Sequence, residues 1–223
     1  MGSIERIWKD RLYQEFARIG KSLSSPKRLE LLDLLAQGPK AVELLASQTG
    51  MSMANVSQHL QILHEARLVR FTKRGTYVIY ELVDDAVADF MLSLHRLSER
   101  QLVEIKQIKT EVLEHHAPME PISMEELKRR MEKGEVLLLD VRPRDEYEAN
   151  HIPGAISVPF EELEQHLAAL PTRKDIVAYC RGPYCLQSAQ AAELLKREGY
   201  NAFHLVESVL EWRQFAEQHH FMG

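Results

Sequence analysis

Residues 176–185, IVAYCRGPYC, decide how the second half of this chain folds. They open as an apolar run, and residues 136–141, VLLLDV, form a second one. Apolar runs of this kind are typical of strands that are buried on both faces of a parallel sheet. Helical patterns alternate with them, so we expect an α/β domain with a central parallel sheet. Ligands of such sheets bind beyond the carboxyl ends of the strands, which is where Cys180 stands.

The segment after Cys180 is predicted to be an anion-binding loop that leads into a helix. Backbone N–H groups of a strand-to-helix loop can converge on an anion, and Gly182 lets the loop fold tightly. These dipoles, together with Arg181, favour the thiolate of Cys180 and make it nucleophilic; they also suit a terminal persulfide anion. Besides the two cysteines, the loop comprises Arg181, Gly182, Pro183, Tyr184 and Leu186.

Cys185 is open to two interpretations. It is either a small apolar side chain packed at the start of the helix, or a resolving thiol that attacks a persulfide on Cys180. The second interpretation gives a disulfide or a polysulfide link, and a direct disulfide needs Cα atoms within about 7 Å. The chain has 223 residues and two cysteines, too few for a disulfide-stapled secreted scaffold, so the pair points to thiol chemistry.

The first half of the chain predicts a helix-turn-helix followed by a β-hairpin. Apolar residues recur every three or four positions from Trp8 to Leu23, and further helices are expected at 26–37, at 42–48 and after Ser52, which suits an N-cap. Residues 68–74 and 76–82 are β-rich and are joined at Gly75, which predicts a hairpin with a basic tip.

Residues 84–114 predict one amphipathic helix of about 30 residues. So long a helix would leave its apolar face in water unless a second copy of the chain, or the first helix of that copy, covered it. We therefore expect a homodimer that forms through the N-terminal helix and helix 84–114.

A polar helix face and a basic hairpin tip favour DNA as a partner. Between Leu44 and Tyr80 the sole acidic residue is Glu65, although the net charge of the chain is −5. Short polar side chains opposite a buried face can meet base edges in the major groove, and Lys73 and Arg74 suit phosphate or minor-groove contacts. A solvated surface helix beside an unrelated cationic turn explains the same residue types.

Residues 51–70, MSMANVSQHLQILHEARLVR, followed by FTKRGTYVIYEL at 71–82, resemble the winged helix-turn-helix of the ArsR family of bacterial repressors. The resemblance covers roughly residues 5–110 and implies a dimer that reads adjacent major grooves of double-stranded operator DNA. It assigns the base-facing role to Ser52, Met53, Asn55, Ser57, Gln58 and His59. Residues 38–44, GPKAVEL, lack the cysteines with which many ArsR proteins sense metals, so we expect neither a metal nor a cofactor.

Residues 137–160, LLLDVRPRDEYEANHIPGAISVPF, and residues 177–185, VAYCRGPYC, resemble the rhodanese family of sulfurtransferases. By this resemblance Cys180 accepts a sulfane sulfur and passes it to a thiol, while Asp140 and Arg142 brace the loop. The chain departs from the family pattern at Cys185, where arginine is commoner, and at Glu207-Ser208, where Gly-Gly is usual. Leu186 occupies the arginine position of the C-x5-R phosphatases, which argues against phosphatase activity.

We expect a winged helix-turn-helix domain at 1–116, a linker at 117–122 and a rhodanese-like domain at 123–223. The sequence lacks a long apolar segment and a signal peptide, so we expect a cytoplasmic protein with no membrane partner. Our hypothesis is a repressor that senses persulfides or polysulfides through Cys180, with a sulfane-sulfur donor and a thiol acceptor as partners. The alternatives are a sulfurtransferase tethered to DNA, a thiol–disulfide sensor of oxidants, and a rhodanese that serves as a dimer scaffold.

Overall fold

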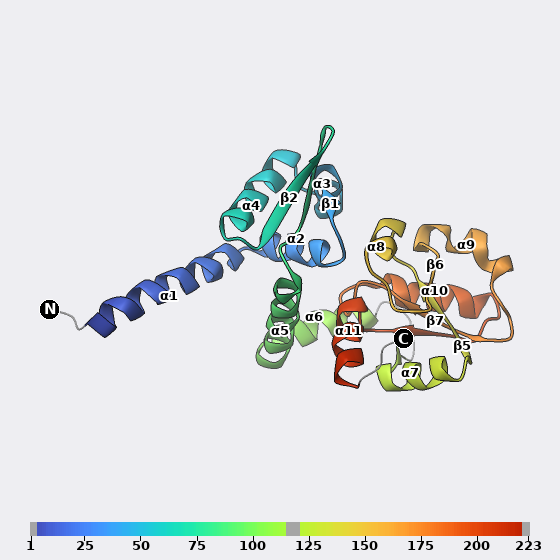
Figure 1. Ribbon diagram of the computed structural model, residues 1–223. Helices are drawn as coiled ribbons and strands as arrows, with labels where there is room; N and C mark the ends of the chain where they lie inside the picture. Colours follow the sequence, from blue (N-terminus) through green and yellow to red (C-terminus); the bar gives the residue numbers. More distant parts are fainter. Residues whose placement is uncertain (1–3, 115–120, 220–223) are drawn as a thin grey trace. The chain divides into compact units, whose positions relative to one another are not determined.

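The computed structural model describes residues 4–114 and 121–219 (Figure 1). Its contacts divide the chain into two compact units, with the division between Ser93 and Leu94. Most of the expected linker, residues 117–122, lies outside the described residues.

The first unit consists of helices and a small antiparallel sheet with the strand order β1-β3-β2. Its buried core is formed mainly by leucines of the central helices, such as Leu31, Leu45 and Leu60, and by Met91. In chain order the elements are α1 (Ile4–Leu23), α2 (Pro26–Ala36), β1 (Lys40–Ala41), α3 (Val42–Thr49), α4 (Met53–Glu65), β2 (Val69–Arg74), β3 (Tyr77–Leu82) and the first turns of α5 (Asp85–Gln101).

The predicted winged helix-turn-helix is confirmed. Its turns and helix ends follow from particular residues of the sequence. Gly50 ends α3 with a φ of 66°, a left-handed conformation, so that the chain turns sharply into α4. The side chain of Ser52 caps α4 by accepting a hydrogen bond of 3.3 Å from the backbone N–H of Asn55. Strands β2 and β3 pair so that Arg74 faces Tyr77, which leaves a two-residue turn at the tip of the wing.

The prediction of one continuous helix over residues 84–114 was wrong. The segment forms two helices, α5 and α6 (Val103–Glu114), with Leu102 outside both. Lys109 Nζ lies 2.8 Å from Glu99 Oε1, whereas ten residues of straight helix would separate two positions by about 15 Å. The chain therefore changes direction between α5 and α6, although the local sequence contains neither proline nor glycine.

The second unit contains a five-stranded sheet with the order β4-β8-β7-β5-β6, in which every pair of neighbours is parallel. The predicted α/β domain with a central parallel sheet is thus confirmed. After α6 its elements are β4 (Pro121–Ile122), α7 (Met124–Glu132), β5 (Val136–Asp140), α8 (Arg144–Ala149), β6 (Ile156–Ser157), the 3-10 turns η1 (Phe160–Glu162) and η2 (Leu167–Ala169) with α9 (Leu163–His166) between them, β7 (Asp175–Tyr179), α10 (Gln187–Arg197), β8 (Ala202–Leu205) and α11 (Val209–Gln218).

Helices cover both faces of this sheet, so the domain has two apolar layers. Tyr179 belongs to the layer that includes Trp212 of α11, and Cys180 belongs to the layer that includes Ala191 of α10. Successive residues of a strand point to opposite faces, which is why neighbours in sequence enter different layers. Among the described residues, no helix is long and apolar enough to cross a membrane.

Two glycine substitutions test the turn that orients α4. We expect Gly50→Ala to lower the free energy of unfolding by about 1 kcal/mol, because alanine is disfavoured at positive φ. Gly20→Ala lies inside α1 and should raise it by about 0.5 kcal/mol, since alanine is a better helix former. Urea unfolding followed by circular dichroism measures both changes, and shifts of the same sign in the two variants would contradict the assignment.

Candidate functional site

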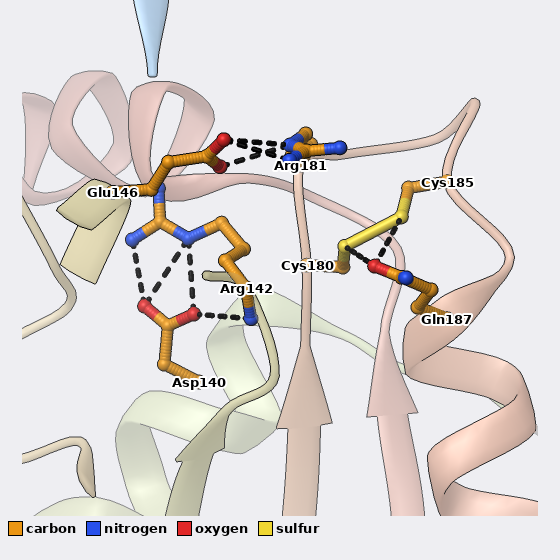
Figure 2. Close-up of a disulfide and its surroundings, with 7 residues drawn as sticks. All are labelled: Asp140, Arg142, Glu146, Cys180, Arg181, Cys185 and Gln187. Carbon is orange, nitrogen blue, oxygen red and sulfur yellow. Dashed lines mark hydrogen bonds and ion pairs between the residues drawn. A yellow bond between two sulfur atoms is a disulfide. The ribbon is translucent and has the colours of Figure 1, made fainter. Parts of the chain in front are cut away.

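The candidate site lies at the carboxyl edge of the parallel sheet, where β5 and β7 end side by side (Figure 2). Asp140 is the last residue of β5, and Cys180 directly follows the last residue of β7. Cys180 is 1% exposed, so its sulfur is shielded from bulk water. The pairing of β5 with β7 therefore determines where the Cys180 sulfur lies, independently of the contacts of the loop that follows.

Cys180 and Cys185 are joined by a disulfide in this structure, with their Cα atoms 6.4 Å apart. The loop between them folds back through a hydrogen bond of 3.0 Å from the N–H of Cys185 to the carbonyl oxygen of Gly182. These are the only cysteines of the chain. The sequence left the role of Cys185 open, and the loop brings its sulfur within bonding reach of Cys180.

The first turn of α10 lies against the two sulfur atoms. Gln187 Oε1 is 3.5 Å from Sγ of Cys180 and 3.8 Å from Sγ of Cys185, as Figure 2 shows. In the reduced protein a thiol can donate to this oxygen. The amino-terminal end of the helix carries a partial positive charge, which favours a thiolate or persulfide anion at this place.

Gly182 lets the loop approach α11 closely. Its φ is 118°, a region that L residues rarely adopt, and a Cβ atom built on it would lie 3.3 Å from Cβ of Ser208. Ser208 in turn caps α11 in a reciprocal capping box with Glu211. The serine that departs from the family's usual glycine is thus the neighbour that limits the space at Gly182.

Arg181 points to Glu146 of α8 and forms a two-pronged ion pair with it. The Nε and Nη2 atoms of Arg181 lie 2.7 to 3.1 Å from the carboxylate oxygens, and the side chain of Glu146 is fully buried. The carboxylate balances the guanidinium charge that we expected to act on Cys180. Glu146 lies within residues 137–160, which resemble the rhodanese family, but its place in the sequence did not indicate that it pairs with Arg181.

Asp140 and Arg142 form a buried pair with each other beneath the loop. Arg142 Nη2 lies 2.6 Å from Asp140 Oδ2, and the hydroxyl of Tyr179 donates to the same oxygen at 2.6 Å. Arg142 also donates to the carbonyl oxygen of Asn150 at 2.6 Å. Burial, followed by the nearby Asp140 carboxylate, raises the pKa of Tyr179, so the phenol stays protonated. The network therefore ties the end of β5 to the end of β7.

The residues expected to face DNA lie on α4 and on the wing of the first unit. Exposed positions on α4 and its cap are Ser52, Met53, Asn55, Ser57 and Gln58. His59 is partly buried, and its Nδ1 has no hydrogen-bond partner. Lys73 and Arg74 are exposed at the end of β2. The opposite face of α4 buries Val56, Leu60 and Leu63, so the helix presents its polar side outward.

No cluster of three or more histidine, cysteine or acidic side chains within residues 4–114 and 121–219 could hold a metal ion.

Comparison with known proteins finds matches in both halves of the chain. Residues 123–215 match the rhodanese-like domain family, and residues 25–70 match the family of bacterial regulatory proteins of the arsR type. The chain is 41% identical over 205 residues to the HTH-type transcriptional regulator Rv0324 of Mycobacterium tuberculosis, which covers 92% of this chain and 90% of that protein.

Two further relatives each match one part of the chain. Thiosulfate sulfurtransferase PspE of Escherichia coli is 39% identical over 64 residues, which is 28% of this chain and 60% of that protein. The solved winged helix-turn-helix domain of Mb0332 from Mycobacterium bovis is 36% identical, with a TM-score of 0.42, and the match covers 46% of this chain and 93% of that chain.

Substitution of Gly182 tests the close contact with α11. We expect Gly182→Ala to destabilise the second unit by about 2 kcal/mol, because it adds backbone strain and a contact with Ser208. Gly199→Ala is the matched control: its φ of 87° is also positive, but nothing lies within 4 Å of the added atom. Urea unfolding followed by the fluorescence of the buried Trp212 compares the two, and equal losses would show that Ser208 does not limit the space.

Proposed function

The chain belongs to the ArsR family of HTH-type transcriptional regulators and carries a rhodanese-like domain after its DNA-binding domain, and from this premise we propose that it is a repressor that senses reactive sulfur species. The observation that carries the proposal is the pairing of Cys180 with Cys185 at the end of β7. A regulator whose only two thiols meet in a strand-to-helix loop has one evident place for sulfur chemistry.

The first chemical step is sulfur transfer to Cys180. Its thiolate attacks the outer, sulfane sulfur of a donor R–S–SH, the S–S bond of the donor breaks, and the thiol R–SH leaves. Cys180 then carries a terminal persulfide. The partial positive charge at the amino-terminal end of α10 favours this anion.

The second step closes the disulfide. The thiolate of Cys185 attacks Sγ of Cys180, the persulfide bond breaks, and hydrogen sulfide leaves with the bonding electron pair. Two cysteine thiols are oxidised, and the sulfane sulfur of the donor is reduced to sulfide, so the exchange needs no other oxidant. The Cα separation of 6.4 Å lies within the range that a disulfide accepts.

DNA is bound by the first unit. The exposed polar residues of α4 suit base edges, and Lys73 and Arg74 of the wing suit phosphates. We propose a homodimer, since apolar side chains along α1 are exposed, including Ile4, Trp8 and Phe16. A second copy that covers them removes apolar surface from water and places two α4 helices on one operator.

The sulfur signal acts on DNA binding through the relative stability of two dimer conformations. A ligand or modification shifts such an equilibrium only if it favours one state over the other. A covalent bond between Cys180 and Cys185 constrains a loop of the second unit, and this constraint supplies the difference between the states. The oxidised protein is the form with low operator affinity.

A second function, catalytic sulfur transfer, is favoured by the match to a thiosulfate sulfurtransferase across part of the rhodanese-like domain. In that case Cys180 would pass its sulfur to an external acceptor, and the DNA-binding domain would only place the enzyme. Steady-state transfer of sulfur to cyanide, lost in Cys180→Ser while operator affinity stays the same before and after sulfur donors, would support this function.

Operator binding after treatment with a polysulfide donor tests the sensing proposal. We expect the affinity of the wild-type protein to fall about tenfold or more, within the usual range of coupling between two sites. Cys180→Ser should show no response because it removes the acceptor. Cys185→Ser should retain one extra sulfur on Cys180 by mass spectrometry, since no thiol displaces it. Fluorescence anisotropy with labelled operator DNA measures the affinities.

Peroxide provides the control for a general oxidant sensor. Peroxide also closes the disulfide, but the intermediate is a sulfenic acid. The Cys185→Ser variant treated with peroxide should therefore carry no persulfide. If polysulfide modifies Cys180 and operator binding stays unchanged, the sensing proposal is wrong. If peroxide acts at lower concentrations than polysulfide, the site senses oxidants instead.

Salt dependence separates phosphate contacts from base contacts. We expect Lys73→Ala and Arg74→Ala each to weaken binding to every DNA sequence and to reduce the slope of log affinity against log salt by about 1. Gln58→Ala should keep that slope and reduce the preference for operator over random DNA by about 1 to 3 kcal/mol. Titrations at several salt concentrations with both DNAs measure these effects, and a slope unchanged in Lys73→Ala and Arg74→Ala would place the wing away from DNA.

A further inference from the structure

Tyr184, the neighbour of Cys185 in the loop, binds to a polar seat formed by His95, Glu99 and Lys109. The hydroxyl of Tyr184 donates a hydrogen bond of 3.2 Å to Glu99 Oε1. The ring of His95 meets the phenol edge to face at 5.4 Å between centroids, and Lys109 Nζ lies 5.5 Å from the centre of the phenol ring. All four residues belong to the second unit.

The seat exists because the helix breaks at Leu102. His95 and Glu99 are four residues apart in α5 and therefore share one face of the helix, whereas Lys109 comes from α6. The ion pair between Lys109 and Glu99, at 2.8 Å, joins the two helices across the break. Lys109, and after it the Tyr184 hydroxyl, holds the pKa of Glu99 below its usual value, so the carboxylate is the acceptor at neutral pH.

The two ends of the disulfide are held unequally. Cys180 follows β7, whose residue Tyr179 is anchored by Asp140 and by the parallel ladder. Cys185 lies outside any helix or strand; one backbone hydrogen bond to Gly182 holds it, its sulfur contacts Gln187, and its side chain is only partly buried against the apolar layer. Opening the S–S bond therefore releases the Cys185 end, and Tyr184 is covalently next to it.

We infer that Tyr184 is a positioning residue that reports the oxidation state of Cys180 and Cys185 to α5 and α6. This inference rests on the proposed sensing function and names its route within the second unit. In the disulfide form the loop holds the phenol on the seat and stabilises the break at Leu102. In the dithiol form the loop is released, the phenol leaves Glu99, and the break loses one of its supports.

The position of α5 makes this a useful place for a signal. Its first turns bury Val87, Met91 and Leu92 in the core of the first unit, while Glu99 belongs to the second unit. One continuous helix thus contributes to both units. A change in the support of its last turns acts on a helix that the DNA-binding unit also uses.

Thermodynamic reciprocity provides a test that needs no DNA. If the disulfide favours the seated phenol, then the seated phenol favours the disulfide by the same factor. We expect Tyr184→Phe, which removes the hydrogen bond to Glu99, to make the disulfide about three- to tenfold easier to reduce, as one hydrogen bond allows. Tenfold corresponds to about 30 mV in reduction potential. Equilibration with reduced and oxidised glutathione, followed by trapping of thiols and mass spectrometry, measures this constant.

Matched variants locate the effect. Tyr200→Phe removes a phenol hydrogen bond in the same unit, to the carbonyl oxygen of Leu167, and should leave the redox equilibrium unchanged. Glu99→Gln should shift the equilibrium in the same direction as Tyr184→Phe, and the double variant should add little to either. An unchanged equilibrium in Tyr184→Phe, or the same shift in Tyr200→Phe, would overturn the inference.

Hydrogen exchange of the full chain shows whether the helix break responds. In the wild-type protein we expect amides of residues 97–110 to exchange about threefold or more faster in the dithiol form than in the disulfide form, because the seat has lost the phenol. In Tyr184→Ala the two forms should exchange alike. Equal rates in the two forms of the wild-type protein would also overturn the inference.

The two hypotheses fail in different ways. If operator affinity of the wild-type protein is the same in both redox states, the sensing function fails, and the Tyr184 inference is then judged by the glutathione equilibrium alone. If the wild-type affinity changes with oxidation and Tyr184→Ala shows an equal change, the sensing function stands and Tyr184 does not report to α5.

Discussion

The buried ion pair between Asp140 and Arg142 is the interaction on which the sulfur site depends. A charged pair in an apolar layer is tolerated only where its remaining hydrogen-bonding atoms are satisfied, and here the hydroxyl of Tyr179 and the carbonyl oxygen of Asn150 do so. Because Tyr179 is the last residue of β7, the pair fixes the end of the strand that carries Cys180. The sulfur is therefore placed by groups that never need to react.

A fixed Cys180 makes the rest of the loop the part that can change. Arg181 is held by Glu146 of α8, and Gly182 lies against Ser208 at the start of α11, so the first half of the loop is anchored on two helices. The second half contains Tyr184, which is half-exposed and contacts Glu99, and Cys185, which is partly buried against the layer that includes Ala191. Chemistry at the sulfurs thus acts on the side of the loop that has the least buried support.

Local patterns predicted the sheet, the helix-turn-helix and the wing because those elements follow from periodicity, capping and turn residues that lie close together in sequence. The parallel strands were predicted from apolar runs, and the start of α4 was predicted from Ser52, which suits an N-cap. The break at Leu102 was missed because Gln101, Leu102 and Val103 all suit a helix, and the contacts that accompany the break join Glu99 to the distant residues Lys109 and Tyr184. The partner of Arg181 was missed for the same reason, since Glu146 precedes it by 35 residues.

The position of Cys185 also bears on the choice between signalling and turnover. A catalytic persulfide must survive until an external thiol arrives, yet Cys185 is held in the same short loop, and tethered groups reach effective concentrations of millimolar and above. Closure of the disulfide therefore competes well with transfer and ends each cycle with an oxidised protein that a reductant must restore. For an enzyme this is self-inhibition, whereas for a regulator it records that the donor was present.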